Sequence, residues 1–280
     1  MKNQQIKVIA FDADDTLWDC QGHFEKVMQH LYDELTPWVD RETAAMELFA
    51  TERKNMHLLG YGVKAFTLSM LETAMRVSRN EMPVATINDI LQRCYGLLQF
   101  PCTPLPQVEE TLKALRKKAS PFGERLEGAF PFEERFGGMG WQESLPFGGR
   151  FGGMGWQESL PLGGRFGGGY TLAVFTKGEL LDQEHKLERS GLAPYFDHVE
   201  ITSDKGEKEF LDLCRKLNVR PDELMMVGNS LKSDIAPALG IGAQAVYIPF
   251  HVTWQLEHYE DFEHERLKKI EQFGELLKFL

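Results

Sequence analysis

The stretch FDADDTLWD, from Phe11 to Asp19, directly follows an apolar run that begins at Ile6. A short β-branched run that ends abruptly in acids predicts a buried parallel strand whose carboxyl end presents charged groups to a cleft. Alternation along an extended chain places Asp12 and Asp14 on the same side. Two neighbouring carboxylates, with Thr16 behind them, suit metal-assisted phosphoryl chemistry. The alternative interpretation is a strand end followed by an acidic, solvated turn.

Length and composition indicate a globular protein with one substantial core and a smaller second unit. The chain has 280 residues, of which 42% are hydrophobic and 26% charged. The formal net charge of -11 disfavours nonspecific binding to nucleic acid or anionic membranes, because such partners need clustered Lys and Arg. A small phosphorylated molecule is still allowed as a partner, since bound Mg²⁺ and one well-placed Lys reverse the local field.

The N-terminus and the cysteines predict the cellular location. The sequence begins MKNQQIKVIAFDADD, whose apolar run is too short for a signal peptide, and no stretch approaches transmembrane length. The four cysteines are widely spaced in apolar or helical surroundings and lack metal-binding spacing. We therefore expect reduced core thiols in a cytoplasmic enzyme. The cysteines are Cys20, Cys94, Cys102 and Cys214.

Residues 21–104 have a different character, because β-branched strand runs give way to helical spacing. Apolar residues recur every three or four positions in four blocks, which predicts four amphipathic helices separated by prolines and glycines. The prolines of PCTPLP, residues 101–106, predict a stiff extended link, and a helix is expected over 108–118. The four blocks are Phe24 to Leu35, Met46 to Ala50, Phe66 to Leu71 and Ile87 to Cys94.

A fifteen-residue unit, FGGMGWQESLPFGGR, begins at Phe136 and recurs almost unchanged over 151–165. The two copies differ only at Phe147 and Leu162, which indicates a recent duplication and not a solenoid. Residues 119–168 are rich in glycine, so we predict a flexible insertion at the amino-terminal edge of the sheet. The alternative is a partner-docking surface formed by exposed Phe and Trp side chains.

A second strand is predicted by YTLAVF, residues 170–175, and it ends in Thr176-Lys177-Gly178. A hydroxyl and backbone amides at the start of a helix suit phosphate oxygens, because the amide groups point at the anion. A plain helix N-cap is the alternative interpretation of the same residues. The following helix is expected over 179–190 and ends at Gly191.

The C-terminal third contains two further predicted strands, at 224–227 and 245–249. Between them, a helix is expected to begin at Ser233 or Asp234 and to continue to Leu239. The tail predicts a loop and then a charged helix that ends the chain. We assign no chemistry to the tail, including its His and Trp residues, because lone residues of these types are usually packing or surface groups.

Four motifs, taken in order, resemble those of the haloacid dehalogenase-like (HAD) superfamily of phosphatases. The first is D-x-D-x-T beginning at Asp12, and the second is Thr176 after a strand. The third is Lys205 ahead of a helix, for which the nearby Lys208 competes. The fourth is GNSLKSDI, residues 228–235.

The resemblance implies an α/β fold with a Rossmann-like parallel sheet core and an inserted all-helical cap domain. The core comprises residues 1–19 and 105–280, and the cap comprises residues 20–104. The glycine-rich duplicated insertion, residues 119–168, lies within the core.

The resemblance also implies a Mg²⁺-dependent mechanism. Asp12 attacks phosphorus to form an aspartyl-phosphate, and Asp14 protonates the leaving alkoxide and then activates water. Mg²⁺ is held by the Asp12 carboxylate, the Asp14 backbone carbonyl and Asp234. The phosphoryl oxygens bind Thr176, the amides of Lys177 and Gly178, and Lys205, while Asn229 and Ser230 support the site.

These residues favour a phosphatase that acts on a small phosphorylated metabolite. Asp14 disfavours a dehalogenase, because dehalogenating members of the family lack the second aspartate. A phosphotransferase or mutase of the same family shares both aspartates and remains an alternative. A non-catalytic scaffold that uses the aromatic insertion is a third hypothesis. The sequence names neither the substrate nor the oligomeric state.

Overall fold

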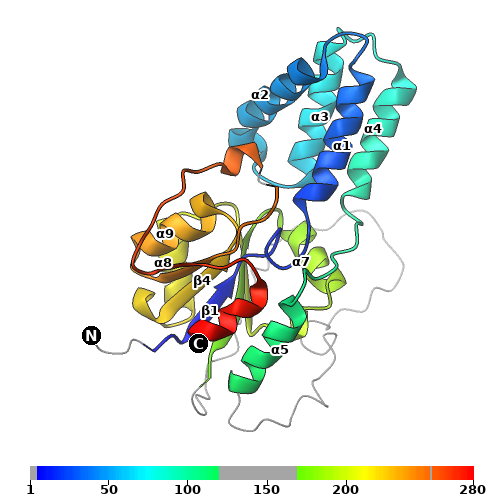
Figure 1. The fold of residues 1–280 in the computed structure, drawn as a ribbon. Helices are drawn as coiled ribbons and strands as arrows, with labels where there is room; N and C mark the ends of the chain where they lie inside the picture. Colours follow the sequence, from blue (N-terminus) through cyan, green and yellow to red (C-terminus); the bar gives the residue numbers. More distant parts are fainter. Residues whose placement is uncertain (1–4, 120–168, 253) are drawn as a thin grey trace, which may run out of the picture.

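The computed structural model describes residues 5–119, 169–252 and 254–280, which form a six-stranded parallel sheet and a four-helix unit (Figure 1). The sheet order is β3-β2-β1-β4-β5-β6, with β1 between β2 and β4. The predicted α/β class with a Rossmann-like parallel sheet is confirmed. The strands are β1 (Val8–Phe11), β2 (Thr171–Lys177), β3 (His198–Thr202), β4 (Leu224–Gly228), β5 (Gln244–Tyr247) and β6 (Leu267–Lys269).

Helices cover both faces of the sheet, which explains why β1 is apolar at every position. Ile9 and Phe11 belong to the hydrophobic cluster that includes α5 (Val108–Ala119) and α7 (Leu180–Arg189). Val8 and Ala10 belong to the opposite cluster, with α8 (Glu207–Lys216) and α9 (Ala236–Gly240). Because side chains alternate along a strand, a sheet buried on both faces needs a continuous apolar run.

The four predicted amphipathic helices are present and form the four-helix unit, α1–α4, with a hydrophobic cluster of its own. Buried side chains from each helix, such as Leu31 and Met70, fill this cluster. Figure 1 shows the unit beyond the carboxyl end of β1. The helices are α1 (Gln21–Glu34), α2 (Arg41–Leu59), α3 (Val63–Val77) and α4 (Val84–Gly96).

The sequence pattern did not predict two of the strands, β3 and β6, or the type of helix formed by the C-terminal residues. β3 and β6 are the outer strands of the sheet, and their exposed positions break the apolar run that identifies a buried strand. The helix predicted at the end of the chain is present only as a short 3₁₀ helix, and a strand that was not predicted precedes it. The tail thus adds β6 and a 3₁₀ helix, Phe273–Phe279, whose buried residue Phe273 stacks on Phe11 with ring centroids 5.9 Å apart.

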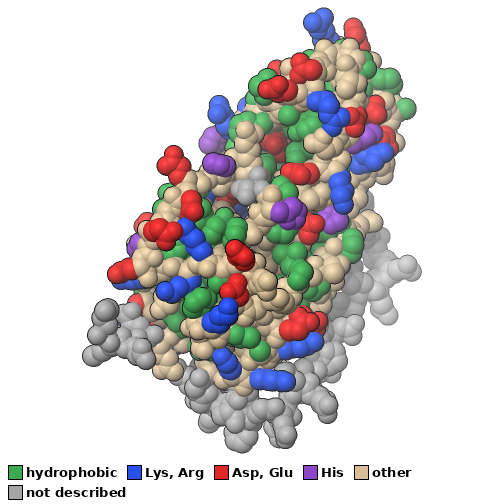
Figure 2. Space-filling view, in the orientation of Figure 1, with side chains coloured by type: hydrophobic (Ala, Val, Ile, Leu, Met, Phe, Trp, Pro, Cys, Tyr) green, Lys and Arg blue, Asp and Glu red, His purple; other side chains and the backbone are tan. Residues whose placement is uncertain are grey.

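The four cysteines are buried and free, in agreement with the predicted core thiols. In the described part of the chain, every helix is too short or too polar to cross a membrane. Acidic and basic side chains are interspersed on the face that Figure 2 shows. The predicted insertion at 119–168 lies outside the described residues except for Ala119, the last residue of α5.

Candidate active site

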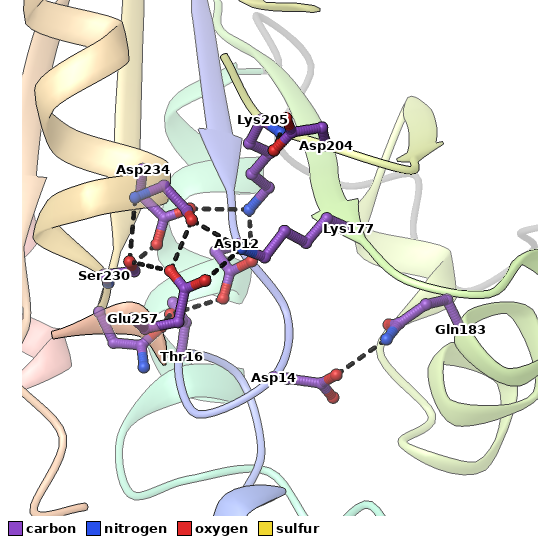
Figure 3. Close-up of polar contacts among 12 residues, drawn as sticks. Asp12, Asp14, Thr16, Lys177, Gln183, Asp204, Lys205, Ser230, Asp234 and Glu257 are labelled. Carbon is purple, nitrogen blue, oxygen red and sulfur yellow. Dashed lines mark hydrogen bonds and ion pairs between the residues drawn. The ribbon is translucent and has the colours of Figure 1, made fainter. Parts of the chain in front are cut away.

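Two aspartates and a lysine meet at the carboxyl edge of the sheet, where Asp12 follows β1, Asp234 follows β4 and Lys205 follows β3 (Figure 3). The Asp12 amide donates to the Val227 carbonyl oxygen at 2.9 Å. The Lys205 Nζ donates to Asp234 Oδ1 at 2.7 Å and also to Asp12 Oδ1. Both carboxylates therefore lie within hydrogen-bonding distance of one nitrogen atom, which means that they are close enough to share a cation.

The strand order explains why these residues meet. The chain runs from β1 to β2 and β3 on one side, and it returns to β4 on the other side of β1. In an open parallel sheet such a reversal leaves a crevice at the carboxyl ends of the strands, where ligands bind. Asp12 and Asp234 stand on opposite sides of this crevice, after β1 and β4.

A π-helical turn after β4 directs Asp234 back toward β1. The turn spans Leu231–Ile235, whereas an α-helix from Ser233 or Asp234 was predicted. The Ser230 amide donates to Asp234 Oδ2 at 2.9 Å, and the Ser230 carbonyl accepts the amides of Asp234 and Ile235. π turns are rare and often occur at functional sites. Apolar periodicity does not reveal one, because it differs from an α turn only in its backbone bonds.

All three residues of this group are buried, and burial acts on the pKa values of Asp12 and Lys205. Asp12, Lys205 and Asp234 are 8%, 3% and 1% exposed. Burial and the neighbouring Asp234 charge raise the pKa of Asp12 to about 7. Burial acts to lower the pKa of Lys205, but the two carboxylates raise it above its ordinary value. Lys205 is therefore charged at neutral pH. When Asp12 is ionised, two carboxylates face one ammonium, and the resulting excess of negative charge attracts a further cation.

Asp14 faces α7 and lies apart from the Asp12 carboxylate (Figure 3). It accepts hydrogen bonds from Gln183 Nε2 at 2.8 Å, Trp18 Nε1 at 2.8 Å and Lys186 Nζ at 3.0 Å. Burial acts to raise the pKa of Asp14, but the Lys186 charge and these hydrogen bonds hold it below its ordinary value. Asp14 is therefore a carboxylate at neutral pH.

Strand alternation does not explain the position of Asp14. β1 ends at Phe11, and the chain turns at Asp15, whose φ is 62°. The Asp15 carboxylate accepts the amides of Cys20 and Gln21 at 2.8 and 2.9 Å, which closes the turn. Asp15 and the contacts from α7 are site features that the sequence analysis did not identify.

The predicted phosphate-binding segment begins inside β2, at Thr176, and one of its backbone amides is not free to bind phosphate. Thr176 is buried at the end of β2 and lines the same cavity as Asp12. The Gly178 amide, however, donates to the Thr202 carbonyl oxygen at 3.0 Å. Because the sheet already uses this amide, we do not retain Gly178 as a donor to phosphate.

Lys177 contacts a residue from the tail that the sequence analysis left without chemistry. Its Nζ pairs with Glu257, donates to Ser233 Oγ at 2.7 Å and lies 4.1 Å from the centroid of the Tyr61 ring. Glu257 also accepts from Ser230 Oγ at 2.7 Å. The tail residue Glu257 therefore lies in the site, although the sequence suggested no role for the tail. No local motif marks Glu257, since it reaches the site only through the fold.

The two candidate lysines of the third motif occupy different environments. Lys205 is buried between the two aspartates, whereas the Lys208 side chain is 81% exposed and lies 3.6 Å from Glu209. The geometry favours Lys205. Near it, Thr16 Oγ1 lies 3.2 Å from Asp12 Oδ2 and 3.1 Å from Asn229 Oδ1, so Asn229 has a supporting position.

The described residues offer a donor set that fits Mg²⁺. No group of three or more His, Cys, Asp or Glu side chains that could hold a metal ion occurs among them. Asp12 and Asp234 are two hard carboxylates on one crevice, and Mg²⁺ is commonly held by one or two carboxylates, with water and substrate phosphate completing the octahedron. Zinc sites typically use His and Cys ligands; among the described residues that line this cavity, Cys20 is the one residue of these types, and its Sγ lies 3.6 Å from Lys186 Nζ.

A cavity of about 180 Å³ lies between the sheet and the four-helix unit, and all nine predicted site residues line it. Trp254 and Glu257 from the tail line it as well, although the sequence analysis gave neither a role. Its small volume suits a small ligand. The four-helix unit contributes Phe24, Met28, Glu52, Asn55, Met56, Gly60, Tyr61, Gly62, Ala65, Phe66 and Ser69.

Gly228 gives a test of this geometry, because a Cβ at this position would overlap the carboxylate of Asp234. We expect Gly228→Ala to destabilise the protein by about 1–3 kcal/mol, the usual range for overpacking. Urea unfolding measures this change. The control is Gly96→Ala at the end of α4, where an added Cβ meets nothing within 4 Å. Equal stability of the two variants would contradict the close packing of Asp234 against β4.

Comparisons with known proteins agree with the fold. Residues 168–242 match the model of the haloacid dehalogenase-like hydrolase family. A haloacid dehalogenase-like family hydrolase from Xanthomonas campestris has a similar structure, with a TM-score of 0.72 and 23% identity, covering 100% of this chain and 93% of that one.

Two curated relatives are phosphatases by name. The glyceraldehyde 3-phosphate phosphatase of Pyrococcus furiosus is 29% identical over 39% of this chain and 48% of its own length. The N-acylneuraminate-9-phosphatase of Homo sapiens is 32% identical over 26% of this chain and 32% of its own length. The chain thus spans less than half the length of these relatives. Residues 168–242 therefore carry the sequence pattern of the haloacid dehalogenase-like hydrolase family, and the chain as a whole shares the fold of a solved hydrolase of that family.

Proposed function

We propose that this protein is a Mg²⁺-dependent phosphatase that hydrolyses a small phosphorylated metabolite through an aspartyl-phosphate. The observation that carries the proposal is the buried group of Asp12, Lys205 and Asp234 at the carboxyl edge of the sheet, in a cavity bounded by the four-helix unit. A carboxylate approaches a phosphate dianion only when cations neutralise that charge. The phosphatase names of the two curated relatives support the same class of reaction.

Asp12 is the proposed nucleophile. In the first step, an Asp12 carboxylate oxygen bonds to phosphorus while the bond to the leaving oxygen breaks, and an alcohol is released. In the second step, water attacks phosphorus, the bond to Asp12 breaks, and inorganic phosphate is released with the carboxylate restored. The cavity holds Asp12 buried and hydrogen-bonded near Thr16, so its orientation is set before substrate binds.

Lys205 and Thr176 are the proposed ligands of the transferred phosphoryl group. Their donors line the cavity beside Asp12, where negative charge spreads over the equatorial oxygens during transfer. Asp12, Asp234 and the Asp14 backbone carbonyl would hold Mg²⁺. When bound, this ion neutralises phosphate charge and excess carboxylate charge.

Asp14 is the proposed acid and base. Its lowered pKa fits the second step, in which a carboxylate takes a proton from the attacking water. Donation of a proton to the leaving alkoxide requires the protonated form. Release of the contacts from Lys186 and Gln183 would favour that form.

The four-helix unit is the proposed cap, because it supplies the wall of the cavity opposite the sheet. A wall of this kind excludes bulk water and restricts access to small substrates. We therefore propose a small phosphorylated substrate as the partner, and neither nucleic acid nor a membrane. The buried free thiols support a cytoplasmic location.

Hydrolysis of p-nitrophenyl phosphate tests the proposal. We expect phosphate release with MgCl₂, a fall of about 100-fold or more in excess EDTA, and recovery when Mg²⁺ is added back, because the charge of the phosphate is otherwise unopposed. Calcium should not restore the rate, since it prefers more ligands at longer distances. A folded protein that releases no phosphate would favour the scaffold hypothesis. Phosphoryl transfer to an added alcohol in place of water would favour the mutase or phosphotransferase.

A further inference from the structure

The four-helix unit places one buried acid in the wall of the cavity. Glu52 is 8% exposed and lines the cavity that also contains Asp12. On α2 it follows the buried residues Ala44 and Leu48 at four-residue steps, so it continues the inward-facing stripe of the helix. An apolar residue is expected at such a position. A carboxylate there is costly unless something compensates its charge.

Among the described residues, no Lys, Arg or His forms an ion pair with Glu52. Its hydrogen-bond partner is the side chain of Trp254. Burial still raises the pKa of Glu52 to about 7, so this neutral donor does not offset the loss of water. The lysines that line the cavity form ion pairs with other acids. Lys177 pairs with Glu257, Lys186 with Asp14 and Asp182, and Lys205 with Asp12 and Asp234.

Aromatic side chains line the cavity together with Glu52. Tyr61 and Trp254 meet edge to face, with centroids 5.9 Å apart, and Phe24 and Phe66 do the same at 4.9 Å. All four residues line the cavity with Glu52. A buried carboxylate in a cavity lined by aromatic rings suits an organic ammonium group, which gains both an ion pair and cation–π attraction. A hydroxyl group would add only a second neutral donor beside Trp254.

We propose that Glu52 binds an ammonium group on the leaving portion of the substrate, so that the preferred substrates are phosphate monoesters of amino alcohols. This inference rests on the proposed phosphatase function, because the phosphate end of the molecule is taken to lie at Asp12 and Lys205. Glu52 is then a specificity residue that recognises the group released as the alcohol.

Binding of non-hydrolysable phosphonates tests the proposal without catalysis. Aminoalkyl phosphonates with two to five carbons are compared by calorimetry, in MgCl₂ at pH 7.5, with alkyl phosphonates of equal length. We expect at least one amino compound to bind about 10-fold or more tightly than its match, because an ion pair formed in a buried site outweighs a neutral contact. Glu52→Gln should remove this preference. Glu42→Gln, an exposed acid on the same helix, is the matched control and should keep it.

Hydrolysis of the corresponding phosphate esters gives a second measurement. Glu52→Gln should lower kcat/KM for the preferred aminoalkyl phosphate about 10-fold or more, mainly through KM, and leave kcat/KM for the alkyl phosphate within about 2-fold. Equal losses for both esters, or no amino preference at any length, would overturn the proposal. A hydroxyalkyl ester that matches the amino ester would also overturn it.

The two proposals fail in different ways. Amino-selective binding that depends on Glu52, without hydrolysis of any ester or of p-nitrophenyl phosphate, would refute the phosphatase function and retain the ammonium site. Hydrolysis of p-nitrophenyl phosphate with no amino preference would retain the phosphatase function and refute the role of Glu52. Urea unfolding of Glu52→Gln confirms that the variant is folded in both experiments.

Discussion

Asp12→Asn should lower Mg²⁺-dependent hydrolysis of p-nitrophenyl phosphate by about 1,000-fold or more, because an amide cannot replace a carboxylate nucleophile. The protein should stay folded. Asn has nearly the same shape as Asp, and Lys205 keeps Asp234 as its counterion at 2.7 Å. Steady-state rates and thermal unfolding measure the two effects separately.

Asp89→Asn is the matched control for Asp12→Asn. Asp89 is on α4, where it pairs with Arg93 and His30 at half-exposed positions outside the cavity. The same chemical change there should leave the rate within about 2-fold, since surface substitutions have small effects. Activity of Asp12→Asn close to that of the unaltered protein would rule out Asp12 as the nucleophile.

Lys205→Met should destabilise the protein by about 3–5 kcal/mol in EDTA at pH 8, because it leaves buried carboxylates without their ammonium partner. Asp12 and Asp234 would then face each other across the crevice. Two treatments should restore part of the loss. MgCl₂ supplies a new cation, and acid protonates the carboxylates. Without Lys205 we expect the pKa of Asp12 in the folded protein to rise further above its value in the unfolded chain. Protonation of Asp12 therefore favours the folded state at low pH, and this contribution to stability is lost as the pH rises.

Urea unfolding with and without MgCl₂, from pH 5 to 8, measures this prediction. Lys208→Met is the control, since this side chain is largely exposed, and it should change the unfolding free energy by less than about 0.5 kcal/mol. If Lys205→Met were as stable as Lys208→Met in EDTA at pH 8, the buried charge group would not have the energetic role that its geometry indicates.

The spacing of apolar residues along the sequence predicted the buried central strands and the four-helix unit. The central strands β1, β2 and β4 are continuous apolar runs because they are covered on both faces, and such runs are visible in a sequence. The helices of the four-helix unit are visible for the same reason, since each buries one stripe. The edge strands β3 and β6 lack this signal, because their exposed positions admit polar residues.

The residues of the site divide in the same way. Asp12, Thr176 and Asp234 come directly after apolar strands or within a recognisable motif, so the sequence places them at one edge of the sheet. Glu257 and Lys186 have no such marker. They reach the cavity because the tail and α7 pack against that edge, and a contact between distant segments leaves no periodic trace in either segment.

The amino-acid sequence alone predicted the α/β class, the helical segment between the first two strands and, through its resemblance to a known family, nine candidate site residues, with Lys208 competing for the place of Lys205; all nine line one cavity. Only the tertiary structure decided that Lys205 and not Lys208 is buried between the aspartates, that the Gly178 amide is already used by the sheet, and that Glu52 is in the cavity wall. The physical reason is that periodicity records which side of an element is buried. The partners that a buried polar group meets depend on how the elements pack.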